Sequence, residues 1–255
     1  MADHTALWLH PMKEDGWVYS HDAIRADMTD TAAAVARMAS AETLEDWELP
    51  ALQKWWRRCD ENIRQHHDHE ERIFFPRMRA RESCVLAPKM SEDHVVLMKD
   101  LAAVTEAVGN AKTAADLEAC GDLLKVLSDH MLPHLAEEEA DVLVALRKAF
   151  TPKEVRKTMM NPMIKEFTWL ELPHLYRRFS KEGAGGMPVV RAHAVKVLGM
   201  PGFVFDYIDK IPKKIRRYNV EYGFFIEELL DPSKRAGFEA ERVAFAKERG
   251  RCVVM

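Results

Sequence analysis

Residues 66–76 read HHDHEERIFFP, in which His66 stands four residues before Glu70. That spacing brings both side chains to the same face of a helix, one turn apart. Steps of three and four lead back from His66 along an apolar stripe, so this face is expected to be buried. His67 and His69 continue polar faces of the same helix, and we expect both to be exposed to solvent.

Residues 134–144, HLAEEEADVLV, repeat the spacing with His134 and Glu138. An isolated histidine precedes each pair: His21 lies 45 residues before the first pair, and His94 lies 40 residues before the second. Each isolated histidine also leads an apolar stripe in its own segment. The sequence therefore contains one unit twice, and four segments each place a histidine on an apolar face.

Apolar residues recur at helical spacing in four segments, which predicts an all-α fold. We expect helices over about residues 18–39, 50–78, 91–110 and 113–150. Ser91 is the expected N-cap of the third helix. Short connections between the four predict an antiparallel up-down-up-down four-helix bundle in residues 1–150. Residues 151–255 are expected to form an α-helical C-terminal extension, interrupted by Gly and Pro.

The two predicted parts differ in charge. Residues 1–150 carry 17 Lys+Arg and 28 Asp+Glu, a balance of −11, whereas residues 151–255 carry 20 and 13, a balance of +7. The parts are therefore expected to meet different partners. The chain of 255 residues is 47% hydrophobic with 11 Gly and 12 Pro, which suits a helical globular protein rather than a disordered one. We expect no nucleic-acid partner.

The cysteines and the N-terminus favour a cytoplasmic location. The four cysteines include no C-x-x-C and suggest no disulfide framework. The first residues lack a charged start followed by an apolar run, so no secretory signal is expected. No apolar stretch approaches the roughly 20 residues that a membrane-spanning helix needs.

Glutamates and histidines on apolar helix faces predict a metal centre. An ionised carboxylate inside a bundle costs several kcal/mol unless a cation neutralises it, and neutral imidazoles supply no fixed charge. Mixed imidazole and carboxylate ligands suit iron, manganese or zinc. Ligands spread over four helices fit two six-coordinate ions better than one tetrahedral zinc ion, and about four coordination positions remain open. The predicted ligands are His21, His66, Glu70, His94, His134 and Glu138.

These motifs resemble those of the hemerythrin-like, or HHE cation-binding, family. The family signature, H-x-x-x-E-E followed by an apolar pair and proline, matches residues 66–76. Residues 134–144 resemble its second copy, with Val144 where proline often stands. His21 and His94 match the two isolated histidines of the family. The resemblance extends over residues 18–150.

The resemblance implies a non-haem di-iron centre in a four-helix bundle. Glu70 and Glu138 would bridge two iron ions that an oxo or hydroxo group also joins, and the four histidines would be terminal ligands. Zinc or manganese is less favoured. Oxygen-carrying members use a further histidine on the third helix, where this chain has Met98. His130, one turn before His134, is a possible extra ligand.

The departure at Met98 favours the branch of the family that includes iron-sensing and NO- or redox-linked proteins. We therefore expect a protein that binds iron and a small ligand, O2 or NO, in sensing or in iron and redox homeostasis. An enzyme that reduces NO or peroxide at the same centre is the alternative. A ferritin-like oxygenase would show two E-x-x-H motifs, and this chain has only the one from Glu171 to His174.

The chain ends Cys252-Val-Val-Met255, which matches a C-a-a-X farnesylation motif. One lipid chain anchors a protein only marginally and needs a second signal. Basic residues between Lys210 and Arg217 could supply it against an anionic membrane surface. Membrane association through a farnesylated Cys252, with the metal in a structural role, is therefore a third expectation.

Overall fold

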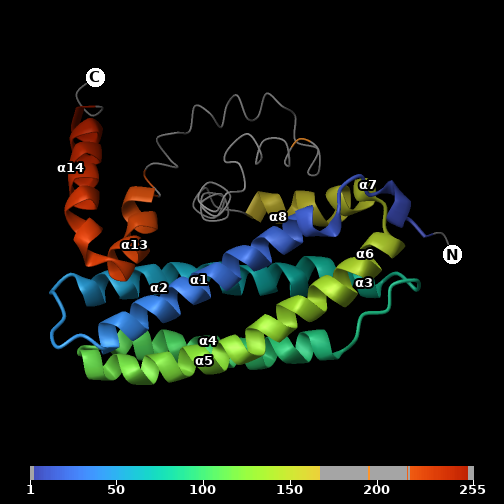
Figure 1. Cartoon of the computed structure of the whole chain (residues 1–255). Coiled ribbons are helices and arrows are strands. Elements are labelled where there is room, and N and C mark those ends of the chain that lie inside the picture. Colours follow the sequence, from blue (N-terminus) through green and yellow to red (C-terminus); the bar gives the residue numbers. More distant parts are fainter. Residues whose placement is uncertain (1–2, 167–194, 196–216, 218, 252–255) are drawn as a thin grey trace.

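Four long helical segments form an antiparallel bundle (Figure 1). The computed structural model describes residues 3–166, 195, 217 and 219–251, and this part of the chain is helical without a strand. The bundle elements are α1 Gly16–Ala39, α2 Glu48–His69, α3 Phe75–Arg79, α4 Lys89–Asn110, α5 Ala114–Glu137 and α6 Leu143–Ala149. Helix α1 packs against α2 and α5, and α4 packs against the same two helices, which closes a ring. The predicted all-α bundle is confirmed.

Local sequence explains where the helices begin. The carboxylate of Asp15 caps α1 by accepting a hydrogen bond from the N–H of Trp17 at 3.1 Å. Helix α4 begins at Lys89, so the predicted cap at Ser91 is wrong. Pro88 already has helical dihedral angles, φ −54° and ψ −33°, which lets the helix start earlier.

Two π-helical turns interrupt the second and fourth segments. The turn Glu70–Phe74 joins α2 to α3, and the turn Glu138–Val142 joins α5 to α6. In each turn the carbonyl oxygen of the glutamate accepts a hydrogen bond from the backbone N–H five residues later. Such turns often occur at functional sites. Both of them begin at the glutamate of an H-x-x-x-E motif.

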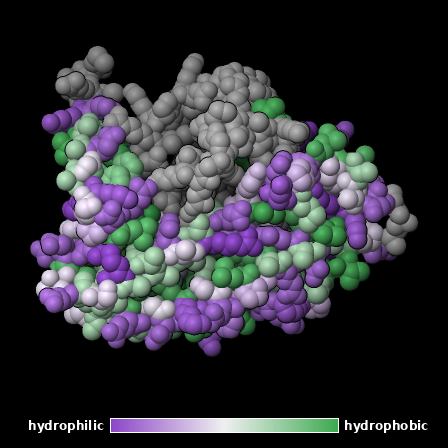
Figure 2. All heavy atoms as spheres, in the orientation of Figure 1, coloured by the Kyte–Doolittle hydropathy of each residue, from purple (hydrophilic) through white to green (hydrophobic). Residues whose placement is uncertain are grey.

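Two apolar clusters fill the bundle and leave a polar layer between them. The residues of one cluster that border this layer are Ile24, Ile63, Leu97 and Met131. Those of the other cluster are Trp17, Ile73, Met90 and Val142. Along each of the four helical segments, the predicted ligands lie in sequence between one residue of the first cluster and one residue of the second cluster. Hydrophilic residues cover much of the outer face of the bundle in Figure 2, as amphipathic helices require.

Segments beyond the bundle extend both clusters. Their elements are α7 Pro152–Val155, the π-helical turn Arg156–Met160, α8 Asn161–Glu166, the π-helical turn Asn219–Gly223, α13 Phe224–Leu230 and α14 Arg235–Arg251. Val155 and Met159 join one cluster. Ile226 and Leu229 of α13 join the other, where α13 packs against α1 and α2. The division of the chain into residues 1–150 and 151–255 stays a prediction.

Several predicted features lie outside the described residues. They include the C-a-a-X cysteine Cys252, the isolated Glu171–His174 motif and most of the basic stretch that ends at Arg217. Within the described ranges, no helix is both long enough and apolar enough to span a bilayer.

Candidate metal centre

One group of four candidate ligands lies in the polar layer of the bundle. It combines His21 of α1, His66 of α2, and Glu70 and Glu138, which begin the two π-helical turns. One ligand atom from each of them lies within 4.8 Å of the others, so the group could hold a metal ion. Two of the separations within the group are 3.0 Å between His66 Nε2 and Glu70 Oε1, and 3.4 Å between His21 Nε2 and Glu138 Oε2.

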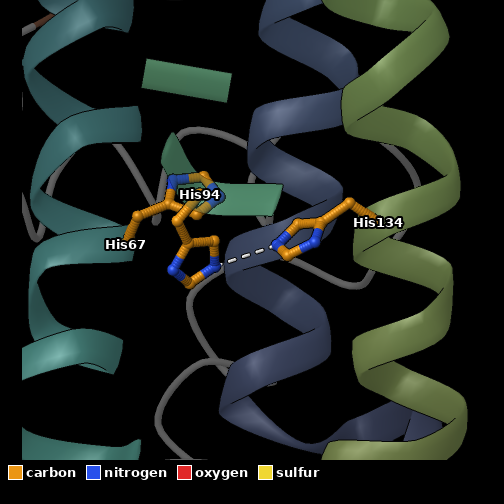
Figure 3. Close-up of side chains that lie close together, drawn as sticks. All are labelled: His67, His94 and His134. Carbon is orange, nitrogen blue, oxygen red and sulfur yellow. Dashed lines mark hydrogen bonds between the residues drawn. The ribbon is translucent and has the colours of Figure 1, made fainter. Parts of the chain in front are cut away.

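A second group consists of three imidazoles, His67 of α2, His94 of α4 and His134 of α5 (Figure 3). Their ligand atoms also lie within 4.8 Å of one another. The Nε2 atoms of His94 and His134 face each other at 3.0 Å. All three side chains are buried, with 2–4% of each residue exposed. Three convergent imidazoles are a common donor set for a transition-metal ion.

Two carboxylates connect the groups. Glu70 places Oε1 3.0 Å from His66 Nε2 and Oε2 3.7 Å from His94 Nε2. Glu138 places Oε2 3.4 Å from His21 Nε2, and Oε1 3.5 Å from the Nε2 atoms of both His94 and His134. Each glutamate therefore directs one oxygen to each group.

The burial of these carboxylates makes the site costly without a cation. Glu70 is 2% exposed and Glu138 is fully buried. Their four oxygens are buried without a hydrogen bond, and so are the Nε2 atoms of His21, His66 and His67. Unsatisfied buried polar atoms are rare because each costs free energy. Carboxylate oxygens and imidazole nitrogens that converge in this way fit metal ions.

Burial and the neighbouring charges shift the pKa values of the side chains in the site. Burial alone would lower the pKa of His21, but Glu138, Glu139 and Glu70 raise it to about 10. Burial would also raise the pKa of Glu138, as would the nearby Glu70, yet the neighbouring imidazoles of His21 and His94 hold it well below its usual range. Burial lowers the pKa of His67 to about 3, so its imidazole is neutral.

The six residues predicted from the sequence all lie in these two groups. The prediction that His67 faces solvent is wrong, because His67 completes the second group. Ile63 lies three residues before His66 and four before His67, so both imidazoles fall in the inward sector of α2. The spacing of three from His67 to Glu70 is the signal that could have identified it.

Two other histidines differ from expectation. His69 is 4% exposed rather than solvated, and Oε2 of Glu166, the last residue of α8, lies 3.5 Å from its Nε2. His130, the possible extra ligand, belongs to neither group. Its side chain is 51% exposed, and its Nδ1 lies 2.6 Å from Asp100 Oδ2. The buried position beside it belongs to Met131.

The fold and these two groups define a four-helix-bundle protein with a buried cation site of histidines and glutamates. Residues 13–146 match the Hemerythrin HHE cation binding domain. This match covers more than half of the chain, and the chain therefore belongs to the hemerythrin HHE cation-binding family. No curated protein and no solved structure matches the chain.

Proposed function

We propose that this protein is a non-haem di-iron protein that binds O2 or NO, in sensing or in iron and redox homeostasis. The observation that carries the proposal is the orientation of Glu70 and Glu138. Each buried carboxylate directs one oxygen to each group of imidazoles, which is the arrangement that two bridged ions require.

The donor set favours a pair of iron ions. The first group offers His21 and His66 with one oxygen from each glutamate, and the second offers three imidazoles with the two remaining oxygens. For six-coordinate ions, about two positions would stay open beside the first group and about one beside the second. Structural zinc prefers four ligands in a closed tetrahedron, which this set exceeds.

The surroundings suit exchange of a small ligand. The His66 side chain is 12% exposed, whereas the other predicted ligands have side chains no more than 5% exposed. Among the predicted ligands, His66 of the first group is therefore the most exposed side chain. Bound iron would supply reversible binding or reduction of a diatomic molecule. The chain's own residues would hold the ions, balance their charge and limit the access of water.

Metal analysis with absorption spectra tests this proposal. Protein reconstituted anaerobically with Fe(II) should hold about two iron ions per chain, and its spectrum should change on addition of O2 or NO. His66→Ala and Glu138→Ala should each lower the iron content. His130→Ala is the matched control, because this exposed histidine on α5 belongs to neither group.

Three results would overturn the proposal: no bound iron, unchanged iron in both site variants, or spectra indifferent to O2 and NO. Sustained turnover of NO or peroxide by the reconstituted protein would instead support the alternative, a di-iron enzyme. Binding without turnover supports a carrier or sensor.

A further inference from the structure

Two glutamates outside both groups contact the isolated histidines. Glu71 Oε1 lies 2.8 Å from His94 Nδ1, and Glu139 Oε1 lies 2.8 Å from His21 Nδ1. Each is the second glutamate of an H-x-x-x-E-E motif, and each reaches a histidine on a different helical segment. The first motif thus contacts the isolated histidine of the second unit, and the second motif contacts that of the first.

Helical geometry explains how the two adjacent glutamates of each motif make different contacts. Glu70 and Glu71 are the first residues of one turn, and Glu138 and Glu139 are the first residues of the other. Adjacent side chains on a helix point about 100° apart. The first glutamate of each pair therefore faces the centre of the bundle while the second lies against the neighbouring helix. The side chains of Glu71 and Glu139 are 35% and 25% exposed.

A carboxylate at Nδ1 has a defined effect on an imidazole. It accepts the Nδ1 proton, which leaves the lone pair of Nε2 available to a metal ion. It also fixes the orientation of the ring and increases the basicity of the ligand. In His21 and His94 the Nε2 atom is the one that faces Glu138, at 3.4 and 3.5 Å.

His67 and His134 of the second group lie in the two H-x-x-x-E-E stretches. Their Nδ1 atoms have other surroundings than those of His21 and His94. His67 Nδ1 donates to the carbonyl oxygen of Ile63 in its own helix, at 2.8 Å. His134 Nδ1 lies 3.6 Å from Asp93 Oδ2, beyond hydrogen-bonding distance. The hydrogen-bonding contacts of carboxylates with Nδ1 that the structure shows within the two groups are those of the isolated histidines His21 and His94. Arg25 holds Glu139 in turn, with Nη2 2.8 Å from its Oε1.

We propose that Glu71 and Glu139 are positioning residues that hold the Nε2 atoms of His94 and His21 toward the metal pair, one glutamate for each group. This inference rests on the proposed function, because it assigns the roles of two residues toward the same centre. Loss of Glu71 weakens the group that contains His94. Loss of Glu139 weakens the group that contains His21.

Cobalt(II) titration followed by absorption spectroscopy tests the roles. Glu71→Ala and Glu139→Ala should each weaken one class of site by about 10- to 100-fold and alter its ligand-field spectrum. Glu71→Gln and Glu139→Gln should recover part of the loss, because the amide oxygen still accepts the Nδ1 proton. Glu137→Ala is the matched control: its side chain is also 35% exposed, but its carboxylate contacts Lys89.

Double-mutant cycles separate positioning from a general structural effect. In a His94→Ala background, Glu71→Ala should cause no further loss of cobalt affinity, whereas in a His21→Ala background it should cause its full loss. Glu139→Ala should behave in the reciprocal way. Equal losses in both backgrounds, or losses as large in Glu137→Ala, would overturn the inference.

Nitrogen-15 NMR of the histidine rings in metal-free protein keeps this test separate from the proposed function. The wild type should show slowly exchanging Nδ1 protons for His21 and His94. Glu139→Ala should abolish the first signal only, and Glu71→Ala the second only. Those results with no bound metal would overturn the di-iron proposal and retain the positioning of the two rings. If the wild type binds two metal ions but the variants keep its ring signals and its metal affinities, the positioning of the two rings is overturned and the di-iron proposal stands.

Discussion

At the scale of single residues, His67 gives the second group a third imidazole, one more than the first group has. Its Nε2 is buried without a hydrogen bond, and its ring lies 4.7 Å from that of His94, centroid to centroid. In His67→Ala, His94 and His134 remain as the imidazoles of that group. One oxygen from each glutamate remains as well, so the second group keeps the same kinds of donors as the first. We therefore expect the second group to bind its ion about 10- to 100-fold more weakly, so that iron content falls below two ions per chain when iron is limiting, while the first group keeps its ligands.

Metal analysis of His67→Ala beside His130→Ala measures this effect. Circular dichroism should show an unchanged helical content in both proteins. Iron content equal to that of the wild type would mean that six ligands suffice and that His67 only fills space.

The candidate site could be predicted from spacing except at this residue. The i, i+4 pairs and the isolated histidines identified six residues that the fold brings together. Periodicity cannot choose between His66 and His67, because both lie within one turn of Ile63 and Glu70. The choice depends on where α4 and α5 stand relative to α2, which is tertiary information. The contacts of Glu71 and Glu139 with histidines of other helices depend on it too.

At the scale of elements, a buried ion pair fixes the beginning of α1 against α6. Arg147 is 4% exposed, and its Nη2 lies 2.6 Å from Asp15 Oδ2. Its Nη1 donates to the carbonyl oxygen of His10 at 3.0 Å. Burial raises the pKa of Asp15, but hydrogen bonds from His10 and Arg147 outweigh it and lower the pKa overall. This network holds the helix that carries His21.

Acid should therefore weaken this attachment. The folded pKa of Asp15 is lower than its ordinary value, so its contribution to stability is present above about pH 4 and is lost as the pH falls through the folded pKa. Asp15→Asn should lower the free energy of unfolding by about 2 kcal/mol at pH 7. The difference from the wild type should shrink below pH 4. Chemical denaturation at several pH values measures it.

Asp22→Asn is the control for this prediction. Asp22 lies on the same helix and pairs with Arg25, but its side chain is 59% exposed. Its effect should stay within about 0.5 kcal/mol at every pH. A constant Asp15→Asn effect between pH 7 and pH 3 would contradict the assigned role of the carboxylate charge.

The bundle helices could be predicted from periodicity with ends correct to within about two residues, because amphipathic stripes and caps are local signals. The π-helical turns could not. The residues of Glu70–Phe74 and Glu138–Val142 suit an ordinary α-helix, so the local sequence does not signal the wider turn that begins at each glutamate.

At the scale of the whole molecule, segments after residue 150 complete both ends of the bundle. Val155 and Met159 extend one apolar cluster, and Ile226 and Leu229 extend the other. Glu166 pairs with Arg72 at 2.7 Å and lies over His69. Sequence patterns could predict that these segments are helical but not which bundle faces they cover, because those contacts join residues far apart in the chain.

The attachment of α14 to α13 depends on a buried carboxylate. Glu228 is fully buried and pairs with Arg242 and with Arg235, the latter at 3.0 Å. Glu228→Gln removes the charge at nearly constant volume. We expect hydrogen exchange of the α14 amides to accelerate about 10- to 100-fold, equivalent to about 1.4 to 2.8 kcal/mol, because two arginines lose an ionised partner. Exchange in α1, α2, α4 and α5, and iron content, should stay unchanged.

Glu239→Gln provides the comparison, since Glu239 also pairs with Arg242 but its side chain is 53% exposed. Its exchange pattern should match that of the wild type. Unchanged exchange in Glu228→Gln would contradict the role of the ion pair. If hydrogen exchange accelerated equally in the bundle helices, the predicted division near residue 150 would be contradicted. The contacts of Ile226 and Leu229 with the bundle would then join both parts into one cooperative unit.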